Sequence, residues 1–432
     1  MKEMKIKLFT LIALAFVTSG TFAQITITDS VSMLPSTVVD VFYNLETGKK
    51  DTVRNNNWHL AFAMRHAQPP LKTMQAATVL INEGRGVSLY SSTQTLTNWS
   101  TFDTTNWMTW PSNFNSDSTL EVGAFNKGLN SSNPFDYGWG QYNTTSRDVV
   151  GAKIFLVAID GPYPGAPSSG FRKVCIQKIA YDSQWVFTIS KLDGTDSNTV
   201  TINKSQFNGK LFAYYNMNTN TVIDREPIPY SQWNLLFTRY KTLVTLGPQT
   251  VMYPVMGVLQ NPNTMAYKVA GASANAAIYD TTKFNARVRG IDWDWKEITT
   301  TPGEWPVKDS LVYFTRVDNK INKIKFTQYY AASDRQVVVF SKTSYAGLSV
   351  NENVHNNVTA SVYPNPATTE LNIELSNAKQ ANVTISNLSG KTIATGNFTN
   401  AGKVDVSGLQ TGMYLLNIAT ENGSQTIKFI KQ

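Results

Sequence analysis

Two parts of this chain carry the same residue pattern, and an internal repeat constrains how a chain divides into folding units. Residues 42–48 read FYNLETG, and residues 214–220 read YYNMNTN. Further along each part, residues 57–65 read NWHLAFAMR and residues 232–240 read QWNLLFTRY. Because the two matches have nearly the same separation, we interpret them as a duplication.

The later parts of the two copies match more loosely, and each copy closes with a strand-like run. Between the copies, residues 193–198 read DGTDSN, a composition that is typical of turns. The sequence therefore predicts a first β domain over residues 24–195 and a second over residues 196–346.

Alternating side chains within the repeat indicate β-strands. Trp58, Leu60 and Phe62 fall on one face at a period of two, and the second copy shows the same alternation. We expect this face to be core, so His59 should point away from the core. The chain is 12% aromatic and only 16% charged, against about 25% charged in typical domains, which suits a mainly β fold.

The N-terminal residues have the three parts of a secretory signal peptide. Lysines precede an apolar run over residues 8–17, and a site of small residues ends at Ala23, directly before Gln24. The apolar run is shorter than a membrane-spanning helix. The sequence therefore predicts a removable signal peptide over residues 1–23, and export.

The residue pattern changes again near the C-terminus. Prolines precede a stretch of alternating apolar residues at 371–375, and further short strands with glycine turns follow. This spacing predicts a small antiparallel β-sandwich. We place the sandwich at residues 361–432, behind a polar linker at residues 347–360.

This C-terminal stretch resembles the sorting domain of the type IX secretion system of the Bacteroidetes. The residues that carry the resemblance are Tyr363, Pro364, Asn365, Pro366, Gly390, Gly412, Tyr414 and Lys431. The resemblance implies entry into the periplasm and then transport by the type IX secretion machinery. The mature protein would be secreted, or anchored to lipopolysaccharide on the outer-membrane cell surface.

The two predicted β domains resemble the HmuY-like family of haem-binding proteins. The carriers are the pattern at residues 42–48, the Trp-x-Leu-x-Phe strand and residues 81–87, which read INEGRGV. The resemblance implies an all-β fold, with haem as the cofactor, held by two histidines or two methionines. No His or Met maps onto the later segments from which that family supplies its ligands.

Axial ligands of haem iron are usually His or Met. Only His59 and His66 lie in the predicted β domains, so they are the histidine candidates, with exposed surface histidines as the alternative. A methionine route would use residues that more often fill cores: Met64, Met74, Met108, Met252, Met256 and Met265.

The sequence gives little indication of thiol chemistry, nucleic-acid binding, catalysis or metal binding. The single cysteine, Cys175, lies in a strand-like stretch and is expected to be a buried, inert thiol. The net charge of +8 comes from scattered basic residues, which does not favour nucleic-acid binding. We find no catalytic constellation and predict no metal site.

Two groups of residues have open interpretations. Trp99, Trp107 and Trp110 could stack on sugars or form the core of an insertion, and Asp292 and Asp294 could pair or face solvent.

Taken together, these features of the sequence predict a non-enzymatic, exported ligand-binding protein. Haem or another porphyrin is the ligand implied by the resemblance, and the alternative is a surface adhesin or glycan-binding protein.

Overall fold

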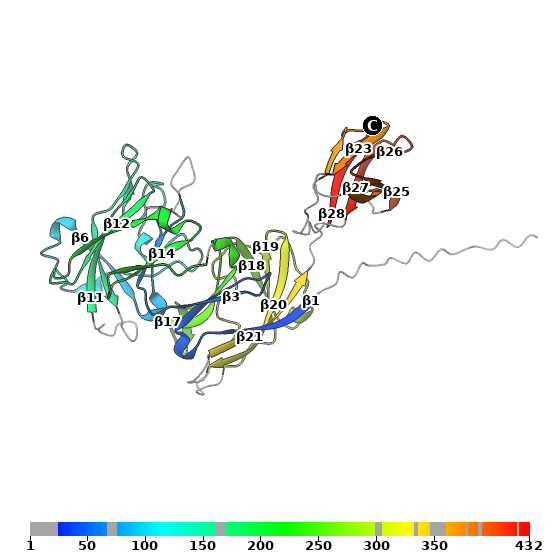
Figure 1. Ribbon diagram of the computed structural model, residues 1–432. Coiled ribbons are helices and arrows are strands. Elements are labelled where there is room, and N and C mark those ends of the chain that lie inside the picture. The colour runs from blue at the N-terminus through cyan, green and yellow to red at the C-terminus, as the bar shows by residue number, and fades with distance from the viewer. Residues whose placement is uncertain are drawn as a thin grey trace, which may run out of the picture. The chain divides into compact units, whose positions relative to one another are not determined.

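The computed structural model describes residues 25–66, 76–159, 170–227, 229–298, 305–331, 336–345, 360–375, 379–387, 391–420 and 423–432. The predicted signal peptide with Ala23 and Gln24, almost all of the linker, and Gly390 lie outside these ranges. The chain divides into two compact units, Met1–Ala346 and Gly347–Gln432. The described residues form strands and short 3-10 helices, which confirms the mainly β prediction (Figure 1).

The first unit contains two β modules. The first module has an eight-stranded sheet and a four-stranded sheet. The eight-stranded sheet contains, in spatial order, β13 (Asn198–Asn203), β12 (Gln184–Ser190), β11 (Gly170–Ala180), β10 (Lys153–Ile159), β6 (Ser88–Thr95) and β7 (Ser112–Asn113), with β8 (Gln141–Tyr142) and β9 (Val149–Val150) beside β11. The four-stranded sheet contains β15 (Thr221–Ile223), β14 (Phe212–Asn216), β4 (Leu60–Ala63) and β5 (Val79–Ile81).

The second module is built from one five-stranded and one four-stranded sheet. The five-stranded sheet has the order β1 (Ile25–Ser32), β21 (Gln336–Tyr345), β20 (Lys320–Ala331), β19 (Leu311–Val317) and β18 (Thr264–Ala270). The four-stranded sheet has the order β17 (Gln249–Gln260), β16 (Leu235–Leu246), β2 (Val39–Tyr43) and β3 (Lys50–Arg54).

Short 3-10 helices lie between these strands. They are η1 (Pro35–Thr37), η3 (Glu83–Arg85), η4 (Leu96–Asn98), η5 (Trp107–Thr109), η6 (Ala124–Asn126), η7 (Lys204–Phe207), η8 (Tyr230–Gln232) and η9 (Ala274–Ala276). No helix in the described ranges is long and apolar enough to span a membrane.

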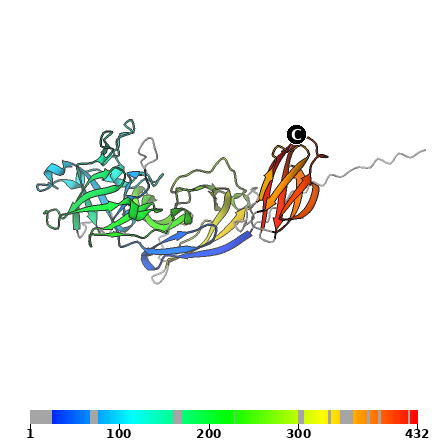
Figure 2. The same ribbon diagram turned by 45° about the horizontal axis from the view of Figure 1, so that its top comes forward.

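The two predicted copies exchange their first strands. β1, β2 and β3 belong to the first copy, yet β1 pairs with β21 and β2 pairs with β16 in the second module. Conversely, β13 and β14 belong to the second copy, yet they pair with β12 and β4 in the first module. Both views show the blue β1 running beside β21, which is far away in sequence (Figures 1 and 2).

The exchange moves the division between the modules away from the predicted boundary at residues 195 and 196. Residues 191–197 connect β12 to β13, which pair antiparallel, so this boundary falls inside a β-hairpin. The first module is therefore continuous, from β4 to β15. The second module combines β1 to β3 with β16 to β21.

The strand pairings of the two modules are reciprocal. Tyr43 of β2 faces Leu235 of β16, and Tyr215 of β14 faces Leu60 of β4. In the repeat, Tyr43 corresponds to Tyr215 and Leu60 to Leu235, so each pair is the counterpart of the other. The buried cores follow the same division, because the core of the second module joins Val41 and Tyr43 to residues after β15.

An asparagine after each exchanged strand ties the two copies together. The Asn44 side chain accepts hydrogen bonds from the N–H groups of Glu46 and Thr47, forming an Asx turn. Its Nδ2 then donates to Gln232 O at 2.6 Å. Asn216 repeats both features, and its Nδ2 donates to Asn57 O at 2.8 Å. Each hairpin turn is thus fixed to the copy from which it does not come.

The C-terminal unit contains seven strands. In spatial order these are β22 (Ala360–Tyr363), β23 (Glu370–Leu375), β26 (Ala401–Asp405), β25 (Thr392–Thr399), β24 (Gln380–Asn387), β27 (Gly412–Thr420) and β28 (Gly423–Lys431). β25 and β26 share a single pair, Thr399 with Ala401. A bridge between Ala367 and Lys431 brings the two ends of the sheet together around an apolar core.

The exchange predicts which fragment of the chain folds. A fragment of residues 56–230 contains β14 and β13, which pair with β4 and β12, whereas residues 24–195 lack both strands and expose apolar surface. We expect the first fragment to show cooperative thermal unfolding by circular dichroism and the second to aggregate or remain unfolded. Cooperative folding of residues 24–195 alone would contradict the exchange.

Candidate functional site

His59 is a structural residue of the strand exchange. It is only 4% exposed, so the expectation that it points away from the core is wrong. Its Nδ1 accepts a hydrogen bond from the N–H of Met217 at 3.0 Å. At the equivalent position of the second copy, Asn234 Oδ1 accepts from the N–H of Leu45 at 2.7 Å. The shared role of His59 and Asn234 gives haem ligation by His59 no support.

His66 lies in a different environment. Its side chain is 56% exposed and its Nδ1 lies 3.4 Å from the Asp182 carboxylate. Neither His59 nor His66 lines any of three cavities found among the described residues. Of the candidate methionines, Met64 is buried, Met108 is 80% exposed and Met74 lies outside the described residues.

The residues of the predicted sorting motif gather around the last strand, β28. Asn365 Nδ2 donates to Lys428 O and its Oδ1 accepts from the N–H of Ile430. Gly412 faces Lys431 in the register of β27 and β28. The Tyr414 ring stacks on Phe429, with 5.7 Å between the ring centroids.

The remaining motif residues lie on the surface of this unit. Pro364 and Pro366 are exposed, and Tyr363 is 45% exposed with its hydroxyl donating to Glu374. The motif thus combines residues that close the sheet with residues that face outward.

The tryptophan cluster of the insertion packs on a sheet. Trp99, Trp107 and Trp110 lie against Ile154 and Leu156 of β10. The ammonium group of Lys173 donates to the carbonyl oxygens of Trp99 and Leu192 at 2.5 and 3.1 Å. This packing favours the interpretation in which the tryptophans form a small core of the insertion over the one in which they stack on sugars.

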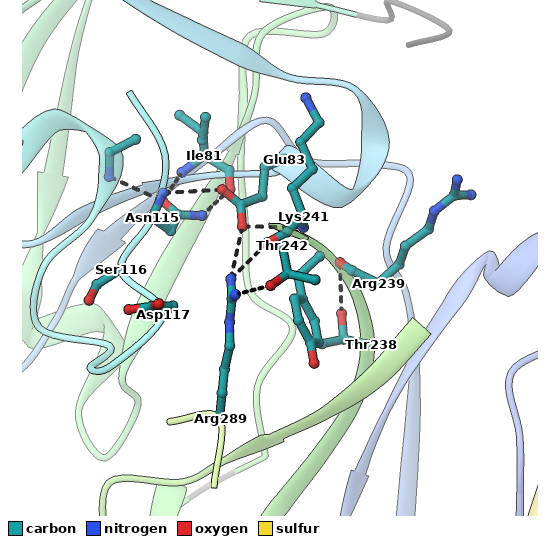
Figure 3. Close-up of polar contacts among 12 residues, drawn as sticks. Ile81, Glu83, Asn115, Ser116, Asp117, Thr238, Arg239, Lys241, Thr242 and Arg289 are labelled. Atoms are coloured by element: carbon teal, nitrogen blue, oxygen red, sulfur yellow. Dashed lines mark hydrogen bonds and ion pairs between the residues drawn. The ribbon is translucent and has the colours of Figure 1, made fainter. Parts of the chain in front are cut away.

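The turn at residues 81–87 docks the first module on the second. The Glu83 carboxylate accepts hydrogen bonds from the N–H groups of Asn115 at 3.1 Å and Lys241 at 3.3 Å, and lies 3.7 Å from the Arg289 guanidinium. Figure 3 shows these groups converging on Glu83, whereas the Arg239 side chain points away. Burial raises the pKa of Glu83 to about 7, which Arg289 and the N–H donors oppose.

Gly84 is required in this turn because the modules touch there. A Cβ atom at this position would lie 2.0 Å from the carbonyl oxygen of Arg239. The next residue, Arg85, reaches the second module, where its guanidinium donates to Ser36 O and Thr37 O and to the side chain of Asn55. Gly84 and Arg85 therefore serve module docking.

The second module carries an aromatic cleft of about 340 Å³, within the range of about 300–1,000 Å³ that is usual for ligand sites. Four aromatic rings line it: Tyr253, Trp293, Trp305 and Tyr329. Two cationic residues, Arg239 and Lys296, also line it, and none of its described lining residues is acidic. We call this feature the aromatic cleft.

The two cations of the aromatic cleft differ in their partners. The buried Lys296 ammonium donates to Met256 O at 2.6 Å and lies over the Trp295 ring at 4.2 Å. Burial lowers the pKa of Lys296 to about 7. The Arg239 guanidinium forms no ion pair with the described part of the chain, and burial lowers its pKa.

A second unpartnered group in the aromatic cleft is an acceptor. The Oε1 atom of Gln336 is buried and has no hydrogen-bond donor among the described residues. The aromatic cleft therefore offers a cation, an acceptor and flat rings, a combination that suits a ligand with an acidic group, hydroxyl groups and a ring face.

Asp292 and Asp294 lie beside the aromatic cleft but do not act as a pair. Asp292 accepts a hydrogen bond from the Tyr240 hydroxyl, and burial raises its pKa. Asp294 pairs with Lys268 at 2.5 Å and accepts from the Tyr313 hydroxyl at 3.2 Å. Their roles are thus structural, and no cluster of metal-ligating residues occurs in the described ranges.

Sequence reasoning named Met256 of the aromatic cleft as a candidate ligand but did not find its other functional residues. Arg239, Trp305 and Gln336 lie on β16, before β19 and at the start of β21. Of these three residues, only Arg239 lies in the repeat pattern at residues 232–240, and that pattern gives it no function.

Comparison with known families identifies one part of the chain. Residues 361–432 match the secretion system C-terminal sorting domain, as the sequence predicted. The C-terminal unit is thus a type IX sorting domain, and the protein is exported through the periplasm by the type IX machinery and is secreted or displayed at the cell surface. No curated protein matches the chain.

Replacing Gly84 with alanine should loosen the docking of the modules. The added carbon overlaps backbone that cannot move aside, so we expect a loss of about 1–3 kcal/mol in unfolding free energy. Urea denaturation measures this loss. Gly170→Ala is the control, because its added carbon would meet only side chains, at 3.3 Å or more. Equal stability of the two variants would contradict the assigned contact.

Glu83 should make stability depend on pH. Because its pKa is raised above the unfolded value of 4.5, its stabilising contribution is fully present below pH 4.5 and is lost as pH rises through about 7. The loss is on the order of 3 kcal/mol.

We expect Glu83→Gln to flatten this part of the profile of unfolding free energy against pH. Glu46→Gln, at an exposed site, should leave the wild-type slope unchanged. A Glu83→Gln profile with the full wild-type slope would show that another group titrates.

Proposed function

We propose that this exported protein acts outside the cell as a non-enzymatic binding protein for acidic glycans. The observation that carries the proposal is the Arg239 guanidinium, which has no ion-pair partner among the described residues and lies in a cleft whose described lining contains no acidic residue. An acidic sugar would supply the carboxylate for Arg239.

The other parts of the aromatic cleft match the same ligand class. Sugar hydroxyl groups would donate to Gln336 Oε1, and sugar ring faces would pack on Tyr253 and Trp305. The binding site would belong to the first compact unit, and the sorting domain forms the second.

Haem is a second candidate because the aromatic cleft also contains a methionine. Met256 is 7% exposed and lines the aromatic cleft, where its sulfur would offer one axial ligand to iron and Arg239 would pair with a propionate. The resemblance to HmuY-like proteins supports this candidate, while Gln336 Oε1 would find no donor on haem.

Removing Arg239 tests the acidic-glycan proposal. Charged hydrogen bonds contribute about 1.5–3 kcal/mol, so Arg239→Gln should weaken binding of a uronate-containing oligosaccharide about ten- to hundredfold. Isothermal titration calorimetry measures the affinity. Arg147→Gln in the first module is the control variant, and a neutral oligosaccharide of equal length is the control ligand.

Two outcomes would overturn the acidic-glycan proposal. One is equal affinity for the acidic and neutral oligosaccharides, and the other is acidic-glycan binding that survives Arg239→Gln. A Soret shift with haemin that disappears in Met256→Ala, without glycan binding, would establish the second candidate in its place.

Deleting residues 361–432 should stop export at the periplasm, because the passenger then lacks the domain that the type IX machinery recognises. Fractionation of the native cells, with antibody detection of the passenger, measures this. A deletion of residues 56–66, which damages β4 but keeps the sorting domain, is the control for misfolding. Surface display of the protein without its sorting domain would contradict the assignment.

A further inference from the structure

A second cavity lies between the two modules and shares one lining residue, Arg239, with the aromatic cleft. It measures about 90 Å³. Three pairs of equivalent residues from the two copies line it: Trp58 with Trp233, Phe42 with Tyr214, and Leu80 with Leu259. We call it the inter-module cavity.

The packing around the inter-module cavity has approximate twofold symmetry. The rings of Phe42 and Trp233 meet edge to face at 5.0 Å, and those of Tyr214 and Trp58 meet edge to face at 4.9 Å. Each contact joins an exchanged strand to the copy that receives it. The cavity is therefore a direct product of the strand exchange.

Three hydrogen-bond donors of the lining have no acceptor. They are Trp58 Nε1, Trp233 Nε1 and Arg225 Nε, all buried and unpartnered among the described residues. Buried donors are nearly always paired with protein, water or ligand. Other core indoles follow that rule, because Trp139 Nε1 donates to Ala77 O at 2.9 Å and Trp185 Nε1 to Ala63 O at 2.8 Å.

The charges around the inter-module cavity are paired except for Arg239, whose side chain points away from Glu83 (Figure 3). Arg225 lies 2.5 Å from the Asp40 carboxylate, and Arg289 lies 3.7 Å from Glu83. Glu226 accepts hydrogen bonds from the Tyr214 hydroxyl and from two backbone N–H groups. An anionic ligand would meet these three carboxylates, so the free donors favour an acceptor without charge.

We propose that the inter-module cavity binds a small uncharged molecule that carries acceptor oxygens, such as a short-chain ketone, alcohol or amide. Its volume is below the roughly 150 Å³ that holds benzene, so the ligand, or the end of a larger ligand, has about three to five non-hydrogen atoms. The oxygen accepts from the indole N–H groups, and the carbon atoms contact Leu80 and Leu259.

Acetone is a suitable probe because it combines a carbonyl acceptor with two methyl groups. We expect acetone titration of the full-length mature protein to shift the indole ¹H–¹⁵N resonances of Trp58 and Trp233 in a saturable way. The resonances of Trp139 and Trp185 are internal controls and should not move, since their N–H groups are already bonded.

Variants separate this site from the aromatic cleft. Trp58→Phe and Trp233→Phe keep a ring but remove one donor each, and should weaken acetone binding about two- to tenfold. Gln336→Ala changes a residue that lines the aromatic cleft but not the inter-module cavity, so it should leave the Trp58 and Trp233 shifts unchanged. This proposal can therefore fail while the acidic-glycan proposal stands.

Three results would overturn the proposal. The first is equal shifts of all indole resonances, which indicates a solvent effect. The second is ordered water on the three donors that acetone does not displace in crystals. The third is binding of xenon without acetone, which indicates a dry apolar cavity.

Discussion

The structure of the passenger depends on the exchange of the first strands between its two copies. Four hydrogen bonds define the exchange: Asn44 to Gln232, Asn216 to Asn57, Met217 to His59 and Leu45 to Asn234. Each bond has a counterpart at the equivalent position of the other copy. Neither module can complete its sheets without strands from the other copy. The two modules are therefore joined by strand pairing as well as by the connecting chain.

The exchange also positions both candidate binding sites. Ser36 and Thr37, which follow β1, line the aromatic cleft together with residues from β16, β17 and β21. The inter-module cavity lies where the exchanged strands meet their recipients. The docking turn with Glu83 and Gly84 also holds the two modules in contact (Figure 3).

Part of this architecture could be predicted from the sequence, because local patterns fix local structure. The repeat, the alternation in its strands and the sorting motif each lie within short stretches, and strands formed where the alternation was found. The exchange could not be predicted from these patterns. Leu60 and Leu235 are equivalent residues of the two copies, so the local sequence gives Tyr43 no preference for pairing with Leu235 over Leu60. Strand pairing between equivalent copies is decided by chain connections and long-range packing, which local patterns do not encode.

His59 and the aromatic cleft show two further limits of the sequence. β4 is buried on both faces, so its alternation does not separate core from solvent, and His59, one residue earlier, is buried as well. The aromatic cleft joins Arg239, Trp305 and Gln336 from distant segments, and each looks ordinary in its own segment.

The strand exchange is tested most directly by native-state hydrogen exchange of the backbone amides in β2 and β14. We expect β2 to open together with β16 and β21, and β14 to open together with β4 and β12, each group with its own opening free energy. The opposite grouping, with β2 opening with β4 and β14 opening with β16, would contradict it.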